Sequence, residues 1–453
     1  MIDPFVTIPW LTRAKRGTGT CHVFAGYVFA LVLFVAVSAS AHAQQYVPPA
    51  GNWERRTAEQ VGLSTAAVEA AVAHAVASGS NASRDLLDAH RGSFGREPHG
   101  EAIGQFMERG DPAGVIIRNG YLIAEWGDPE RVDLTFSVTK SFLSTTVGLA
   151  FDRGLIRDVN DRVRQYMAPV VALKGTPGAH QPLVGIPATW NGVEAERDGA
   201  GTDGSAVAAA GVAYDAFEVI KPFESEHNRV ITWDHLLRQT SDWQGTLWGK
   251  PDWADRPRGD IDEWRARERN EPGTVYAYSD VRVNLLALAS LNVWRRPLPQ
   301  VLRDHVMEPI GASRTWRWNG YENSWVVLDG QLVQSVSGGA HWGGGMWISA
   351  YDMARFGLLT LRKGDWGGNR ILSERWIDMA TTPGTVNESY GFMNYFLNAD
   401  SRPLPNAPAS AFYHLGAGNN VIYVDRENDL VIVARWISSM REFDGVVQRL
   451  LAQ

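Results

Sequence analysis

The stretch Ser137-Val138-Thr139-Lys140-Ser141-Phe142-Leu143-Ser144-Thr145-Thr146-Val147-Gly148-Leu149 is the most informative part of this 453-residue chain. Apolar residues recur at helical spacing from position 137 to position 153, which predicts a buried helix. Residues three apart lie on one face of a helix, so the amine of Lys140 should lie beside the hydroxyl of Ser137. The stretch therefore predicts a helix that begins with a serine–lysine pair.

This serine–lysine pair has two interpretations. A free serine is a poor nucleophile and needs a neighbour that takes its proton, and a helix N-terminus can stabilise negative charge. The alternative is a capping Ser137 with a solvated Lys140. In a chain with 26 serines and six lysines, chance alone gives about a third of one serine followed three residues later by a lysine, so the spacing by itself is weak evidence. A lysine at the head of an almost uncharged helix is costly to bury unless it is paired, which favours the catalytic interpretation.

Two later motifs add candidate side chains. Tyr278-Ser279-Asp280 supplies a tyrosine that could exchange protons beside a cation. His414-Leu415-Gly416-Ala417 directly precedes the last pair of expected strands. Each motif has a rival in the sequence, namely Tyr321 for the tyrosine and His341 for the histidine.

Taken in order, these motifs resemble the serine β-lactamase and penicillin-binding-protein superfamily. The closest likeness is to its class C-like branch, with the family VIII carboxylesterases and 6-aminohexanoate-oligomer hydrolases. Longer segments share the likeness: 134–136, 231–241, 272–280 and 343–357. The resemblance extends over most of residues 60–453 and is weaker between 166 and 230. It favours Tyr278, in the expected loop, over Tyr321, which we expect in a connection.

The resemblance implies an α/β fold of the α+β type, an antiparallel sheet flanked by helices and interrupted by a mostly helical second domain. We expect the sheet domain to span residues 44–165 and 300–453, and the insertion to span 166–299. Hairpin signals at both ends agree with this division. Asn119-Gly120 separates two β-type runs near 115 and 121, and a charged turn at 425–429 separates two more.

The resemblance also implies a role for each candidate residue. Ser137 would attack a carbonyl group, and Lys140 and Tyr278 would shuttle its proton. The backbone N–H groups of Ser137 and Ala417 would form the oxyanion hole. Further substrate contacts would come from Asp280, His414 and Gly416. His341 either lines the pocket or has a structural role in a glycine-rich turn, and Trp248 either lines an apolar acyl pocket or packs in the core.

Two departures from the superfamily pattern bear on the substrate. The second motif usually ends in Asn, whereas Asp280 accepts hydrogen bonds but donates none, and it would favour the charged form of Lys140. The third motif usually begins with Lys in β-lactamases, whereas a neutral His414 is a poor anchor for a carboxylate. Both changes indicate a small-molecule ester or amide substrate rather than a β-lactam.

Two other functions remain open at this point. One is a D-amino-acid or cell-wall peptidase with weak β-lactamase activity. The other is a catalytically silent binding protein on the same fold, which the set of Ser137, Lys140 and Tyr278 disfavours.

The N-terminus predicts export. Residues 1–43 combine basic residues, an apolar run at 23–37 and a small-x-small site at Ala41-His42-Ala43, which is typical of a cleaved signal peptide. We therefore expect a periplasmic or secreted protein with no stable membrane anchor after cleavage. The only cysteine, Cys21, would leave with this segment. A net charge of −7 without a basic block in the mature chain argues against nucleic acid, and no motif indicates a metal or another cofactor.

Overall fold

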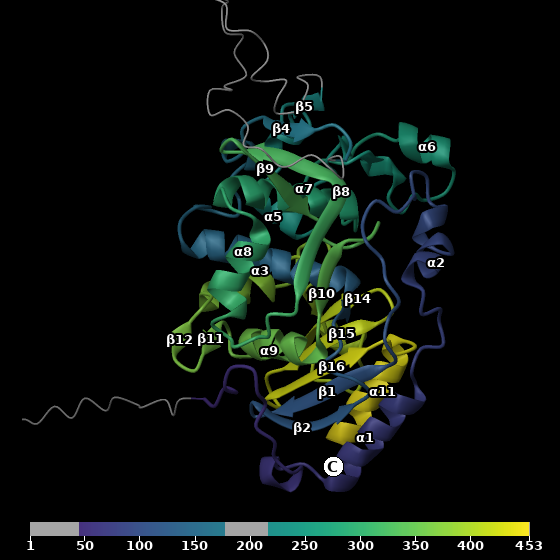
Figure 1. Cartoon of the computed structure of the whole chain (residues 1–453), viewed down its shortest axis with the longest axis vertical. Coiled ribbons are helices and arrows are strands. Elements are labelled where there is room, and N and C mark those ends of the chain that lie inside the picture. The colour runs from purple at the N-terminus through teal and green to yellow at the C-terminus, as the bar shows by residue number, and fades with distance from the viewer. Residues whose placement is uncertain (1–44, 177–215, 453) are drawn as a thin grey trace, which may run out of the picture. The chain divides into compact units, whose positions relative to one another are not determined.

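A six-stranded antiparallel sheet brings the two ends of the described chain together (Figure 1). The computed structural model describes residues 45–176 and 216–452. The predicted signal peptide lies outside these residues. The described residues form one compact unit. The strand order is β13-β14-β15-β16-β1-β2. These strands span Phe396–Leu397 (β13), Phe412–Gly416 (β14), Asn420–Asp425 (β15), Leu430–Arg435 (β16), Ala113–Arg118 (β1) and Tyr121–Trp126 (β2).

Both predicted hairpins are present in this sheet. Asn119 and Gly120 join β1 to β2 with φ values of 55° and 85°. Two consecutive positive φ angles are what a two-residue hairpin turn requires, and Asn-Gly adopts them readily. The charged turn at 425–429 joins β15 to β16, and Val115 of β1 pairs with Val433 of β16. Antiparallel sheets with flanking helices confirm the predicted fold class.

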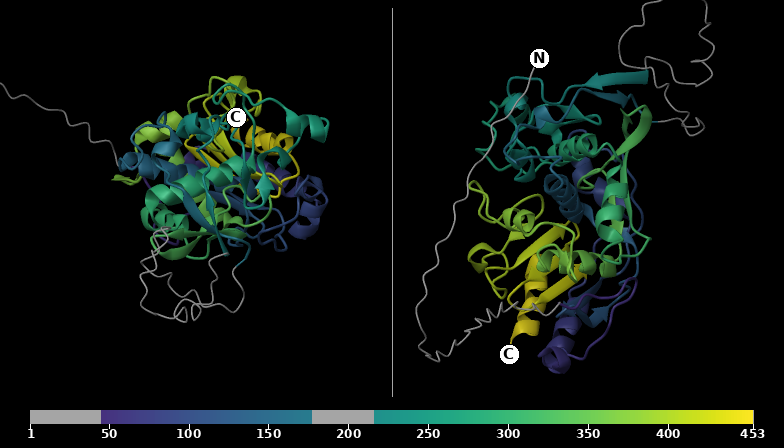
Figure 2. Two further views of the ribbon diagram at one scale, coloured as in Figure 1. Left: turned by 90° about the horizontal axis from the view of Figure 1, so that it is seen from above. Right: turned by 90° about the vertical axis from the view of Figure 1, so that its left-hand side faces the viewer.

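Helices cover both faces of this sheet. Helices α1 (Thr65–Ala77) and α11 (Met440–Leu451) lie side by side, as the purple and yellow helices in Figure 2 show. They pack on Ile116 and Ile432, whereas α9 (Ala350–Leu361) packs on the opposite face with Val115 and Val433. This alternation follows from the two-residue period of a strand. The strands are therefore buried on both sides.

A second antiparallel path contains β3 (Asp133–Leu134), β10 (Gly345–Ile348), β8 (Arg317–Leu328), β4 (Val170–Leu173) and β5 (Phe217–Ile220), with β9 (Gln331–Val336) beside β8. Strand β8 contains the rival Tyr321, so the expectation that this tyrosine lies in a connection is wrong. Strand β4, from the predicted helical insertion, pairs with β8 from beyond it. The middle region therefore shares a sheet with the C-terminal half, and the boundaries at 165 and 300 stay predictions.

The helices of the middle and C-terminal regions surround α3 (Thr139–Asp152), whose residues 139–150 are all buried. A 3-10 turn, η3 (Phe136–Val138), leads into α3. Among the described residues, no helix is long and apolar enough to cross a membrane. The other α-helices among the described residues are α2 (Leu86–Arg91), α5 (Trp233–Leu237), α6 (Ile261–Ala266), α7 (Asp280–Trp294), α8 (Leu298–Leu302) and α10 (Glu374–Ala380). Two small ribbons pair β6 (Thr246–Leu247) with β7 (Lys250–Pro251) and β11 (Asp365–Trp366) with β12 (Asn369–Arg370).

Candidate active site

Ser137 lies in η3, at the start of the buried helix α3. Strand β10 fixes this turn, because the Thr135 N–H donates to the Met346 carbonyl at 2.9 Å and the Met346 N–H donates to the Thr139 hydroxyl at 3.0 Å. Phe136, just before the serine, has a φ of 48°. A bulky residue rarely adopts such a φ, and backbone strain of this kind gathers at functional sites. Ser137 is partly exposed between buried neighbours, so the turn presents its hydroxyl.

Lys140 connects Ser137 to Asp280. Its ammonium donates to Ser137 Oγ at 2.6 Å and to Asp280 Oδ1 at 2.8 Å. Both charged side chains are fully buried, so the lysine is paired as its burial requires. Gly339 permits this packing, since a Cβ there would lie 1.9 Å from Asp280 Oδ1 and 2.2 Å from Lys140 Nζ. The predicted spacing thus corresponds to a hydrogen bond, and α7 supplies the counter-charge.

A second cation balances Asp280. Arg256 Nη1 lies 2.9 Å from Asp280 Oδ2 and 2.5 Å from Asp255 Oδ1. Asp255 also accepts hydrogen bonds from the backbone N–H groups of Asp280 and Val281 at the start of α7. Burial alone would raise the pKa of Asp280, but Lys140 and Arg256 hold it well below its usual range. Asp280 therefore stays ionised at every pH at which the protein would work.

Tyr278 lies beside the same two cations. Lys140 Nζ is 4.7 Å from the centroid of its ring, and the Arg256 guanidinium carbon is 5.1 Å from it. Both distances are within the range of a cation–π contact. The tyrosine is half-buried, in the loop that leads into α7. The structure thus brings Ser137, Lys140 and Tyr278 into one cluster.

The end of β14 passes close to the nucleophile turn. A Cβ at Gly416 would lie 2.1 Å from the Thr135 carbonyl oxygen and 3.2 Å from Ser137 N. Only glycine permits this approach, which brings the next residue, Ala417, close to the Ser137 backbone. Two N–H groups at such a place could hold a developing oxyanion.

His414 lies in the core. Its side chain is fully buried, and Phe356, Tyr395 and Phe412 contact the ring, with centroids 4.6–5.8 Å away. Burial lowers the pKa of His414 to about 3, against the opposing effect of its 3.2 Å hydrogen bond with the Asn394 carbonyl. A neutral imidazole enclosed in this way offers no charge to a ligand. Its burial argues against the expectation that His414 binds substrate, which stays a prediction.

Trp248 also belongs to the core. It is 8% exposed, and it packs with the main hydrophobic cluster from the turn between β6 and β7. Of its two predicted interpretations, the structure favours packing.

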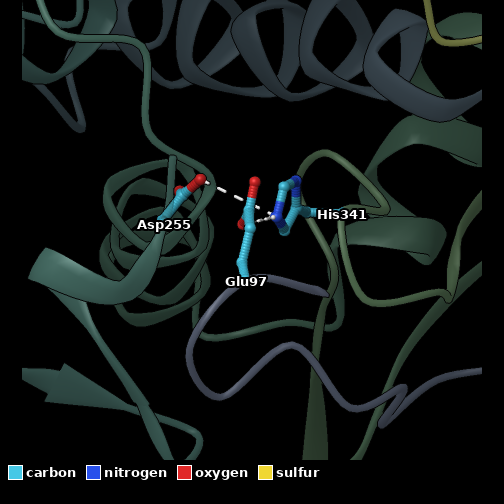
Figure 3. Close-up of side chains that lie close together, drawn as sticks. All are labelled: Glu97, Asp255 and His341. Atoms are coloured by element: carbon cyan, nitrogen blue, oxygen red, sulfur yellow. Dashed lines mark hydrogen bonds and ion pairs between the residues drawn. The ribbon is translucent and has the colours of Figure 1, made fainter. Parts of the chain in front are cut away.

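His341 lies in a cluster with two carboxylates (Figure 3). Its Nε2 is 2.8 Å from Glu97 Oε2 and 3.8 Å from Asp255 Oδ1, and its Nδ1 is 3.8 Å from Asp280 Oδ2. These side chains could hold a metal ion by type and spacing. However, Asp255 already pairs with Arg256, and the Glu97 carboxylate already pairs with His341 Nε2, so these groups have partners without a metal ion. His341 is buried and lies beside Asp280, the carboxylate that pairs with Lys140, which favours the structural role.

Sequence reasoning missed three members of this network: Glu97, Asp255 and Arg256. Glu97 lies 244 positions before His341 and belongs to no motif. Asp255 and Arg256 lie just after Trp253, outside every predicted motif, and their charges carry no signal of a partner in α7. Only the folded chain brings these residues to the site.

Comparisons with known proteins identify the family. A family model described as Beta-lactamase matches residues 101–436. Similar solved structures include a beta-lactamase from Mycobacterium bovis, at 18% identity and a TM-score of 0.44, with 75% of this chain and 94% of that chain covered. A family VIII carboxylesterase is 16% identical with a TM-score of 0.46, and the match covers 75% of this chain and 92% of that chain. A D-stereospecific amidohydrolase from Streptomyces sp. is 14% identical with a TM-score of 0.45, and the match covers 84% of this chain and 98% of that chain. No curated protein matches the sequence.

Proposed function

Because the chain belongs to the beta-lactamase family, we propose that it is an exported serine hydrolase that cleaves a small-molecule ester or amide through an acyl-enzyme on Ser137. The observation that carries the proposal is the position of Lys140 Nζ, 2.6 Å from Ser137 Oγ and 2.8 Å from Asp280 Oδ1. Serine chemistry needs neighbouring groups that take up and return the hydroxyl proton, and Lys140 lies against both Ser137 and Tyr278. Export to the periplasm or medium is part of the proposal and rests on residues 1–43 alone.

The proposed reaction begins when Ser137 Oγ attacks the substrate carbonyl carbon and loses its proton. An ammonium on Lys140, paired with Asp280, has no lone pair to accept that proton. We therefore assign the base to Tyr278, which lies beside Lys140 and Arg256. The N–H groups of Ser137 and Ala417 would stabilise the tetrahedral oxyanion.

The leaving alcohol or amine would then depart with the proton from Tyr278, and the acyl group would remain on Ser137 Oγ. Water would attack this ester and give a proton to the same base, which would pass it to Ser137 Oγ as the acyl–oxygen bond breaks and the acid leaves. Atoms balance over the cycle, because one water is consumed and Ser137 is regenerated.

A simple ester or amide fits this site better than a β-lactam. Asp280 is held in its ionised form, so it cannot donate a hydrogen bond to a substrate amide. His414 is buried and neutral, so it offers no charge to a substrate carboxylate. These two residues replace the side chains that would recognise a β-lactam in the related enzymes that the sequence resembles.

The test is labelling of the mature protein with a fluorophosphonate probe, followed by a panel of p-nitrophenyl esters, linear amides and nitrocefin. Ser137→Ala should abolish both labelling and turnover. Ser141→Ala, one helical turn away and buried, is the matched control and should keep both. The proposal fails if the wild-type protein takes no label, or if Ser137→Ala is labelled as strongly as the wild type.

A further inference from the structure

A cavity of about 270 Å³ lies next to the nucleophile turn. Its far wall comes from the segment between α1 and β1, which contributes α2 and residues 80–83. Its near wall comes from η3, from the turn after β14 and from the residue after β16. The main lining residues are Leu86, Ala89, Phe94, Phe136, Ala417 and Trp436.

The cavity adjoins both proposed oxyanion donors. Phe136 immediately precedes Ser137, and Ala417 is itself a lining residue. The positive φ of Phe136 sets its ring against the cavity, where it meets Trp436 edge to face at 6.3 Å. A carbonyl group held by the Ser137 and Ala417 N–H groups would therefore have one of its two substituents at the mouth of this cavity.

The cavity is lined by one permanently charged side chain. Arg109 lines it, but its guanidinium donates to the carbonyl oxygens of Ser80, Ala82, Ser83 and Gly110, all at 2.7–3.3 Å. Because these hydrogen bonds use most of its donors, Arg109 holds the loop in place and has little left to bind an anionic ligand.

His90 is the other ionisable lining group. Burial lowers its pKa, and its Nε2 already lies 2.8 Å from the Gly100 carbonyl oxygen. The imidazole is therefore neutral, and the remaining walls are aromatic and aliphatic.

We propose that this cavity is a specificity pocket that takes one uncharged, apolar arm of the ester or amide substrate. This inference rests on the proposed function and names the substrate class for it. The pocket would accept up to about nine non-hydrogen atoms, since a water-sized group occupies about 30 Å³ of liquid. Such a volume suits an alkyl chain or a single aromatic ring and is too small for a whole drug-sized molecule. Burying the arm would favour longer substrates through the hydrophobic effect.

The experiment compares kcat/KM for p-nitrophenyl hexanoate and p-nitrophenyl acetate, and for hexyl acetate and ethyl acetate. The first pair lengthens the acyl side, and the second lengthens the alcohol side. In the wild type, one of the two ratios should be on the order of tenfold to a hundredfold. Whichever ratio is large identifies the arm that enters the pocket.

Ala89→Phe should fill the cavity from α2 and bring the large ratio down towards one. Ala89→Leu is a smaller filling change that guards against misfolding, and it should lower the ratio partway. Leu87→Phe is the matched control, because it adds the same ring to the same short helix at a position that does not line the cavity. This control should keep the wild-type ratio.

The inference is overturned if both ratios are near one in the wild type, or if Ala89→Phe and Ala89→Leu leave the large ratio unchanged. A preference for a charged arm, such as a succinate monoester over the hexanoate, would also overturn it. These outcomes differ from failure of the proposed function, in which no ester or amide of either length is turned over.

Discussion

Asp280 accepts a 2.8 Å hydrogen bond from the ammonium of Lys140, and neither side chain is exposed to solvent. Removing two charges from water is costly, and a buried pair offsets that cost only when further hydrogen bonds complete it. Here Arg256 and the Ser137 hydroxyl complete it, so the pair links the nucleophile to the network behind it.

Asp280→Asn should therefore destabilise the protein. The variant leaves the buried Lys140 ammonium without its carboxylate and removes one of the two carboxylates beside the partly exposed Arg256, which should lower the free energy of unfolding at pH 7 by about 3 kcal/mol or more. Chemical denaturation measures this change. Asp400→Asn, in an exposed pair with Arg402, is the control and should change little. Equal stability of Asp280→Asn and the wild type at pH 7 would show that the Lys140–Asp280 pair does not stabilise the folded protein.

The pH dependence of that difference has a defined sign. The pKa of Asp280 is depressed in the folded protein, whereas an unfolded aspartate titrates at about 3.9. Its contribution is therefore fully present above about pH 4 and is lost as the pH falls towards its folded pKa. The stability gap between the wild type and Asp280→Asn should narrow below about pH 4.

The sequence predicted the elements whose signals are local. The Asn119-Gly120 turn and the buried helix after Ser137 depend on neighbouring residues, and a lysine in such a helix had to be paired. The side to which His414 points was not predictable, because β14 is covered on both faces and shows no apolar–polar alternation. Likewise, nothing near Glu97 indicates its distant partner His341.

Gly339→Ala should inactivate the enzyme by steric displacement. The added methyl group would overlap Asp280 Oδ1 and Lys140 Nζ, both of them held in buried contacts. We expect kcat to fall by about a hundredfold, since a small misplacement of catalytic groups has an effect of this size.

Gly384→Ala is the matched control, because a Cβ there meets no atom closer than 3.4 Å. Its turnover should stay near that of the wild type. Full activity of Gly339→Ala would show that the site does not need the present position of the ion pair.

Tyr278→Phe tests the proposed base without removing the ring. The phenylalanine keeps the cation contacts with Lys140 and Arg256 but has no hydroxyl to carry a proton. We expect kcat to fall by about 10²–10⁴-fold with little change in KM, which is the usual contribution of a general base. Tyr276→Phe, two residues earlier in the same loop, should stay within a few-fold of the wild type. Similar losses in both variants would argue against Tyr278 as the base.

His414→Leu should make the protein less sensitive to mild acid. Folded His414 has a pKa of about 3, whereas an unfolded histidine titrates at about 6.5. Between these values the unfolded chain binds the extra proton, so stability falls as the pH drops below about 6.5, by about 1.4 kcal/mol per pH unit. The leucine variant lacks this loss, and it also removes Nε2, a buried atom without a hydrogen-bond partner among the described residues.

Urea denaturation of both proteins at pH 7 and pH 5 measures this effect. At pH 7 the variant loses the hydrogen bond to the Asn394 carbonyl, so it should be no more stable than the wild type. At pH 5 the free energy of unfolding of the variant should rise relative to that of the wild type, because only the wild type has a buried imidazole that resists protonation. His99→Asn, at an exposed position, should keep the wild-type pH dependence. Parallel losses of stability in the wild type and His414→Leu would mean that His414 reaches solvent and titrates normally, and the site would then regain a histidine that could face substrate.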